Sequence, residues 1–237
     1  MAHNEPLFFS QAVHEFWRTR DRQANAQQER GAGDQGARAA VTGGRQMDGF
    51  ISKLTELMLG IGVNPDNIYT RETVLPGYYR PTKDWDLIVA ANGHLLAVIE
   101  LKSQVGPSFG NNFNNRTEEA IGSACDIWTA YRERAFVDSP EPWLGYLFLL
   151  EDCQRSRSPV RVSEPHFKVF DVFRNASYAE RYEIFCRRLV LERKYSAACF
   201  MMTDRNQACS PNNYTEPARD LSVSNFVEQL LRHVAPR

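Results

Sequence analysis

The strongest constraint on the fold is a pair of apolar segments joined by a tight-turn motif. Residues 85–90 form a short apolar run that contains Val and Ile, and residues 94–101 form a second such run. Between them stands Ala91-Asn92-Gly93, which is typical of a hairpin turn, because Asn and Gly tolerate the positive φ angles that such turns require. We therefore expect two antiparallel strands that are buried within a sheet.

The hydrophobic periodicity of the remaining chain predicts the elements that surround this hairpin. We expect further strands at residues 68–75, 143–150 and 197–203, helices at residues 7–29, 47–59, 116–134, 178–191 and 221–234, and polar loops at residues 103–115 and 151–165. Strands that alternate with helices in this order predict an α/β fold, in which a mixed β-sheet is flanked by helices.

A chain of 237 residues is long enough to bury one full hydrophobic core. We expect a single domain over residues 1–237, with its core at residues 47–203. Residues 1–46 would add a helix and a flexible loop that contains five glycines, and residues 204–237 would add a C-terminal helix.

Charge and cysteine content exclude several classes of protein. The 28 basic and 29 acidic residues leave a net charge of −1, which argues against binding nucleic acid by bulk charge alone. The five cysteines form no CxxC pair, and the N-terminus lacks the basic start and apolar core of a signal peptide. We therefore expect a cytoplasmic protein with reduced thiols.

Three charged residues stand at the ends of the two hairpin strands. Glu100 and Lys102 share a face because strand side chains alternate, and the hairpin can bring Asp86 beside Glu100. Two carboxylates in an apolar sheet repel each other, and Mg²⁺ would remove that cost, with the carbonyl of Leu101 as a further ligand. Lys102 beside such a metal suits phosphodiester hydrolysis, because an ammonium can orient water and stabilise the developing charge. The alternative is a solvated strand face or a cross-strand ion pair.

The segment after these residues is rich in amides. Asn or Gln can pair with adenine and Arg with guanine, so the segment is a candidate for reading DNA bases. The candidates for DNA binding are Arg80 and Lys83, which could hold the backbone, and Ser103, Gln104, Asn111, Asn112, Asn114, Asn115 and Arg116. An ordinary polar turn is the alternative.

Two further groups of residues are weaker candidates. Asp48 and Glu56 on the preceding helix could join the metal shell. The basic segment Arg155, Arg157 and Arg161 could contact phosphate or be a plain surface loop.

The motif Asp86 with Glu100-Leu101-Lys102 resembles the PD-(D/E)XK nuclease superfamily, with Trp85 in the place of the proline. The longer segments 75–83 and 100–116 resemble the XhoI family of type II restriction endonucleases, and the resemblance extends from about residue 40 to residue 230.

This resemblance implies a restriction-endonuclease-like core with Asp86, Glu100 and Lys102 as catalytic residues. It also implies a Mg²⁺-dependent homodimer that cuts double-stranded DNA at the palindrome CTCGAG within a restriction–modification system, while a companion methyltransferase protects the same site. A less specific repair nuclease of the same superfamily and a DNA-binding regulator that does not cleave are the alternatives.

Overall fold

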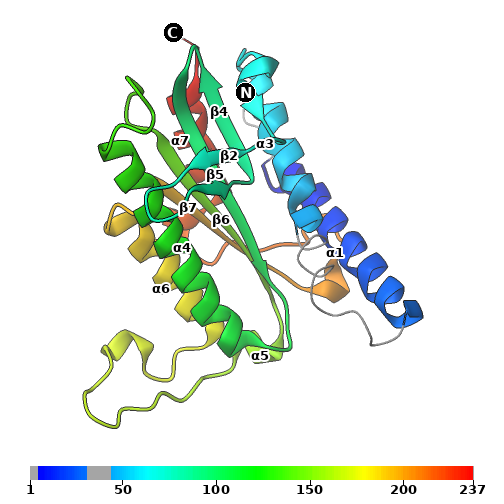
Figure 1. Ribbon diagram of the computed structural model, residues 1–237. Coiled ribbons are helices and arrows are strands. Elements are labelled where there is room, and N and C mark those ends of the chain that lie inside the picture. The colour runs from blue at the N-terminus through cyan, green and yellow to red at the C-terminus, as the bar shows by residue number, and fades with distance from the viewer. Residues whose placement is uncertain (1–4, 31–43, 237) are drawn as a thin grey trace.

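The computed structural model describes residues 5–30 and 44–236, and a five-stranded sheet lies at its centre (Figure 1). Most of the glycine-rich loop expected at residues 30–46 lies outside the described residues. In sheet order, the strands are β1 (Ile68–Tyr69), β4 (Leu87–Ala91), β5 (His94–Gln104), β6 (Trp143–Glu151) and β7 (Ala197–Thr203). The pairs β1–β4 and β4–β5 are antiparallel, whereas β5–β6 and β6–β7 are parallel.

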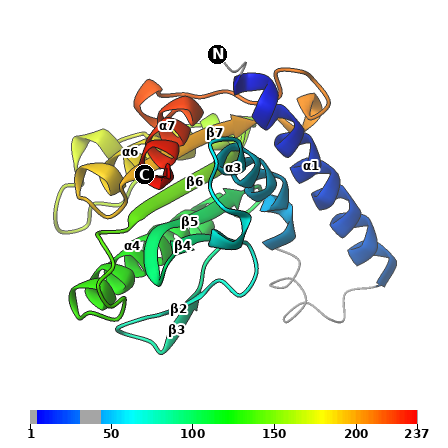
Figure 2. The ribbon, with the colours of Figure 1, turned by 90° about the horizontal axis from the view of Figure 1, so that it is seen from above.

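Helices cover both faces of the sheet, as Figure 2 shows. The α-helices are α1 (Glu5–Arg30), α3 (Asp48–Gly60), α4 (Phe109–Arg132), α5 (Gln154–Arg157), α6 (Tyr178–Leu191) and α7 (Val223–Val234). The short 3-10 helices are η1 (Gly44–Met47), η2 (Pro65–Asn67), η3 (Asp171–Phe173), η4 (Arg205–Gln207) and η5 (Arg219–Leu221). In the described part of the chain, no helix is both long enough and apolar enough to span a bilayer.

Strand β6, which lies between β5 and β7, is buried on both faces because its side chains alternate between two apolar cores. Leu147 and Leu149 pack with α1, α3 and α7, whereas Tyr146 and Phe148 pack with α4 and α6. Burial on both faces explains why residues 143–150 form a continuous apolar run in the sequence. The predicted mixed α/β fold is confirmed.

The β4–β5 hairpin is formed by the turn that its residues predict. Asn92 and Gly93 have φ angles of 53° and 79°, the left-handed conformation that this turn type needs at both positions. Strand pairing runs from Ala91↔His94 to Leu87↔Ile99. The end of the hairpin opposite the turn therefore carries Asp86 and Glu100.

The prediction of a single strand at residues 68–75 is wrong, because two short strands occupy this segment. β1 ends at Tyr69, and β2 (Val74–Pro76) pairs with β3 (Thr82–Asp84) in a separate two-stranded sheet. Glu72 lies between them with a φ of 55°, which reverses the chain locally and ends the extended conformation.

The prediction of a polar loop at residues 103–115 is also wrong. β5 continues to Gln104, and α4 begins at Phe109 instead of at Arg116. Asn is a poor helix former, but the rings of Phe109 and Phe113 pack on α6, with Phe109 5.6 Å from Tyr178 between ring centroids. Tertiary packing therefore outweighs local propensity, and the four-residue spacing of the two phenylalanines is the sequence feature that could have indicated this helix.

The loop expected at residues 151–165 contains the short helix α5. Its first turn is stabilised by Ser156, whose hydroxyl accepts from the N–H of Cys153 at 3.0 Å and donates to the same residue's carbonyl at 2.9 Å.

Candidate active site

The open end of the β4–β5 hairpin brings Asp86 next to the catalytic candidates of β5. Asp86 directly precedes β4, and the pairing of Leu87 with Ile99 sets it against Glu100. The N–H of Leu101 donates a 2.7 Å hydrogen bond to Oδ2 of Asp86. The backbone of one strand therefore fixes the carboxylate that precedes the other.

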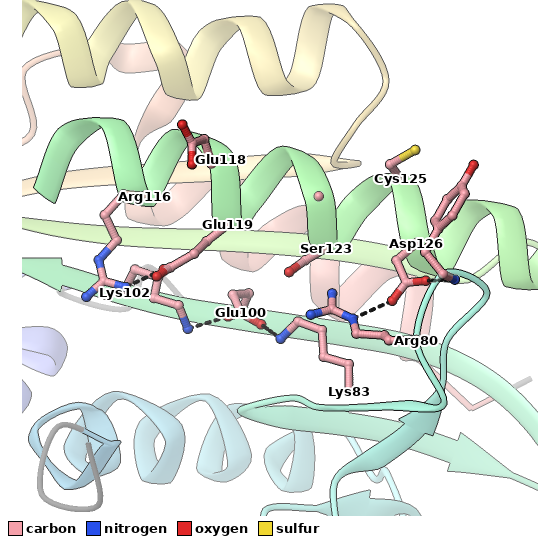
Figure 3. Close-up of a pocket in the computed structure, with 12 residues that line it drawn as sticks. Arg80, Lys83, Glu100, Lys102, Arg116, Glu118, Glu119, Ser123, Cys125 and Asp126 are labelled. Atoms are coloured by element: carbon pink, nitrogen blue, oxygen red, sulfur yellow. Dashed lines mark hydrogen bonds and ion pairs between the residues drawn. The ribbon is translucent and has the colours of Figure 1, made fainter. Parts of the chain in front are cut away.

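The ammonium of Lys102 lies beside both carboxylates. Its Nζ is 3.7 Å from Oδ2 of Asp86. The same ammonium is hydrogen-bonded to Oε1 of Glu100 (Figure 3). Glu100 is only 4% exposed, and a buried carboxylate is stable only with such a partner. One cation can therefore contact Asp86 and Glu100 at the same time.

A second lysine reaches Glu100 from the two-stranded sheet. Lys83 of β3 donates to the other carboxylate oxygen, Oε2, at 2.7 Å, and to the carbonyl of Asp84 at 3.0 Å. Its ammonium also lies 4.1 Å from the centre of the Trp85 ring. The structure thus places Lys83 at the centre of the site, although the sequence predicted a contact with the DNA backbone.

The pKa values of the three catalytic candidates follow from burial and mutual charge. Burial raises the pKa of Asp86, and the negative charge of Glu100 adds to this effect, while Lys102 opposes it. Burial alone would raise the pKa of Glu100, but Lys102 and Lys83 outweigh it and lower this pKa. Burial alone would lower the pKa of Lys102, but the two carboxylates outweigh it and raise this pKa. Glu100 is therefore held ionised and Lys102 protonated.

A cavity of about 700 Å³ opens in front of these residues, between β3, β5 and α4 (Figure 3). Glu100 and Lys102 line it from the sheet, and Ser123 and Asp126 line it from α4. Three cations also line it, namely Arg80, Lys83 and Arg116. Glu118 and Glu119 line it as well, so the cavity presents acidic groups that suit a metal beside basic groups that suit a phosphate.

The predicted DNA-binding amides lie on the first turns of α4 instead of on a loop. Asn111, Asn114 and Asn115 are exposed, and Asn112 is partly buried. Arg116 follows them and pairs with Glu119 at the cavity wall. Ser103 is partly buried near the end of β5.

Gln104 is the one predicted DNA-binding residue whose side chain is fully enclosed. It is 2% exposed, its amide donates to the carbonyl of Phe109 at 3.1 Å, and its Oε1 accepts from the hydroxyl of Tyr182. In this structure the side chain of Gln104 does not face solvent, since it joins the end of β5 to the start of α4 and to α6.

Asp126 is a residue near the site that the sequence did not indicate. This carboxylate of α4 accepts hydrogen bonds from the backbone N–H groups of Tyr78 and Tyr79, at 2.7 and 2.9 Å, and from Nε of Arg80 at 2.6 Å. It is 3% exposed and holds the tip of the β2–β3 hairpin (residues 74–84), which we call the tip hairpin, against α4. A carboxylate on the buried stripe of a predicted helix is the only sequence feature that could have indicated this role.

The two helix carboxylates considered as extra metal ligands lie elsewhere. Glu56 pairs with Lys53 on α3, and Asp48 is exposed at the start of that helix. Neither Asp48 nor Glu56 is among the described residues that line the cavity beside Glu100.

The two carboxylates beside Lys102 suit a hard divalent cation. The residues that the structure describes contain no cluster of three His, Cys, Asp or Glu side chains spaced for a metal. Asp86 and Glu100 nevertheless share one cation, the ammonium of Lys102. Two carboxylates completed by water are a donor set that Mg²⁺ accepts, because this ion keeps several waters in protein sites.

A mixed sheet with two carboxylates and a lysine at the end of its central hairpin, facing a helix, is the arrangement of the restriction-endonuclease-like fold. Comparison with known proteins agrees: the family model for restriction endonuclease XhoI matches residues 26–216. The chain therefore belongs to the XhoI family of restriction endonucleases, and the resemblance seen in its motifs is confirmed.

Three curated relatives are type II restriction enzymes. BstVI of Geobacillus stearothermophilus is 56% identical over 208 residues, which cover 85% of this chain and 92% of the relative. XhoI of Xanthomonas vasicola is 48% identical over 183 residues, covering 76% and 73%, and AbrI of Azospirillum brasilense is 48% identical over 160 residues, covering 67% and 72%. No solved structure matches the chain.

Proposed function

We propose that this restriction endonuclease cuts both strands of DNA at the palindrome CTCGAG by Mg²⁺-dependent hydrolysis of a phosphodiester bond. The observation that carries the catalytic part is the meeting of Asp86 and Glu100 at one ammonium, that of Lys102. Family membership supports the class of enzyme. The particular base sequence rests on the resemblance to the XhoI family.

Asp86, Glu100 and the carbonyl of Leu101 would hold the metal. The N–H and C=O of one strand residue point to the same edge, so the carbonyl of Leu101 faces the edge where its N–H meets Asp86. When bound, Mg²⁺ supplies positive charge to the scissile phosphate and lowers the pKa of its bound water.

Lys102 acts on the water and the phosphate. Its ammonium is protonated and lies beside both carboxylates. It can therefore orient the attacking water and stabilise negative charge on the phosphate oxygens. Ion pairs with Asp86 and Glu100 place Lys102 beside the two carboxylates that would hold the metal.

DNA binding is assigned to the basic cavity wall and to the first turns of α4. Arg80 and Arg116 would contact phosphates, and the exposed amides of Asn111, Asn114 and Asn115 would reach base edges. The side chain of Ser108 makes no cap hydrogen bond at the start of α4, and the positive end of the helix favours a phosphate at the same place.

A palindromic site favours a symmetric enzyme. In a homodimer with twofold symmetry, each subunit would present one catalytic centre to one strand. A companion methyltransferase would protect the same site in the host, without a required complex between the two proteins.

The test uses a supercoiled plasmid with one CTCGAG site and a matched plasmid in which one base pair of that site is changed. With Mg²⁺, the purified protein should linearise the first plasmid and leave the second intact. Lys102→Met should abolish cutting, and Lys53→Met, which removes a lysine paired with Glu56 on α3, should cut like the wild type.

Three outcomes would contradict the proposal. A smear of fragments from both plasmids would indicate a less specific nuclease, and a retarded but uncut plasmid would indicate a regulator. Cutting by Lys102→Met at the wild-type rate would refute the assigned role of this residue.

A further inference from the structure

Lys83 is held at the catalytic centre by three separate contacts. Its ammonium donates to Oε2 of Glu100 at 2.7 Å and to the carbonyl of Asp84 at 3.0 Å, and it lies 4.1 Å from the centre of the Trp85 ring. Its side chain is only 12% exposed. Two hydrogen bonds and a cation–π contact therefore engage this ammonium without any phosphate.

The two oxygens of Glu100 are therefore divided between two cations. Oε1 meets Lys102, whose ammonium is also 3.7 Å from Asp86, and Oε2 meets Lys83. Figure 3 shows the two lysines approaching Glu100 from opposite directions. A cation that bridges the two carboxylates would replace Lys102 beside Oε1, whereas Lys83 would keep Oε2.

The charges of the centre are balanced by these lysines. Asp86 and Glu100 contribute two negative charges, and Lys83 and Lys102 contribute two positive charges. One divalent ion gives the centre an excess of positive charge that a phosphate can offset. A second ion at Oε2 would have to displace an ammonium that Asp84 and Trp85 also hold, and it would add repulsion at short range.

We propose that Lys83 is a built-in second cation of the catalytic centre, which occupies Oε2 of Glu100 and limits the centre to one divalent ion per chain. This inference rests on the proposed function and deepens it by fixing the number of metal ions. In this role Lys83 is a positioning residue that acts through Glu100, and it supplies from the protein the charge that a second metal ion would otherwise bring.

The experiment counts bound ions without DNA. Mn²⁺, which accepts the same oxygen ligands, is added to the full chain, and free Mn²⁺ is measured by electron paramagnetic resonance. The wild type should bind one ion per chain. Lys83→Met should bind two, because Oε2 is released, whereas Lys83→Arg, which keeps the charge, should bind one.

Controls separate this result from damage to the fold. Lys53→Met removes the lysine of another Lys–Glu pair and should bind one ion. Circular dichroism and thermal unfolding check each variant, and Lys83→Gln serves as a second neutral variant that should also bind two ions.

A wild-type count other than one, or a single ion in a folded neutral variant of Lys83, would overturn the inference. The count does not depend on cleavage, so a protein that binds one ion but leaves CTCGAG uncut would refute the proposed function alone. If Lys83 served only as a phosphate contact, its loss would weaken DNA binding and leave the ion count unchanged.

Discussion

Replacing Asp126 by alanine should destabilise the protein and weaken DNA cleavage, although Asp126 lies outside the catalytic group. This residue accepts two backbone hydrogen bonds, from Tyr78 and Tyr79, and one from Arg80. The substitution leaves the tip hairpin without its anchor on α4. Because Arg80 and Lys83 both belong to the tip hairpin and line the cavity, binding of DNA should suffer as well.

The size of the effect can be worked from these contacts. A hydrogen bond to a charged group contributes about 1.5–3 kcal/mol, so the two backbone bonds amount to about 3–6 kcal/mol. The pair with Arg80 adds little, since the arginine side chain is 44% exposed. The freed N–H groups can reach water when the tip hairpin detaches, so we expect a loss of about 3 kcal/mol. For a chain of this size, this lowers the Tm by about 6–12 °C.

The assay combines unfolding in urea, followed by circular dichroism, with cleavage kinetics on plasmid DNA. Asp220→Ala is the matched control, because Asp220 is 53% exposed and pairs with Arg187 at 2.7 Å. An exposed pair of this kind contributes less than about 1 kcal/mol. If Asp126→Ala loses no more stability than Asp220→Ala, or if KM for DNA is unchanged in the Asp126 variant, Asp126 does not anchor the tip hairpin as described.

The stabilisation that Asp126 contributes should decrease at acidic pH. Burial alone would raise the pKa of Asp126, but the N–H groups of Tyr79 and Tyr78 and the guanidinium of Arg80 outweigh it, so this pKa is lowered on folding. The stabilisation is then fully present above the pKa of an unfolded Asp, about 3.9, and is lost as the pH falls through the lower folded value. The stability difference between the wild type and Asp126→Asn should shrink below about pH 4, and a constant difference down to pH 2 would contradict this assignment.

Three further predictions concern neighbouring features. Gly77→Ala should cost about 1–3 kcal/mol in urea unfolding, because an added Cβ would lie 2.6 Å from a backbone oxygen of the same turn, whereas Gly60→Ala, with no atom within 4 Å, should be neutral or stabilising. Tyr182→Phe should cost about 1–3 kcal/mol without changing the DNA sequence that is cut, since it leaves the buried Oε1 of Gln104 without its donor; altered sequence preference would give Gln104 a DNA-reading role. Asn115→Ala should keep or raise the Tm, because Ala is the better helix former, while lowering the cleavage rate at CTCGAG; an unchanged rate would remove Asn115 from the interface.

The meeting of Asp86, Glu100 and Lys102 could be predicted from the sequence because it depends on neighbours along the chain. Asn92 and Gly93 fix a tight turn, and the pairing that follows carries Asp86 to Glu100. Side-chain alternation then places Lys102 on the face of Glu100. The family was also predictable, since its motifs are contiguous segments.

The start of α4 was mistaken because local propensity and tertiary packing disagree there. Asparagines at residues 111–115 favour a turn, whereas Phe109 and Phe113 gain more by packing on α6. The same packing encloses Gln104, so a polar residue that suits DNA recognition by its chemistry instead joins three elements.

The sequence by itself determined the mixed sheet, the hairpin and the meeting of two carboxylates with Lys102, because turn geometry and strand periodicity are local properties. Only the tertiary structure decided that Lys83 binds Glu100 and that Asp126 holds a turn whose Arg80 stands 46 positions earlier in the chain. The first contact joins β3 to β5, which belong to different sheets, and the second joins the tip hairpin to α4. No local sequence pattern encodes how such elements pack against each other. A hydrogen bond of this kind exists only after the cores on both faces of the sheet have fixed α4 and the tip hairpin against each other.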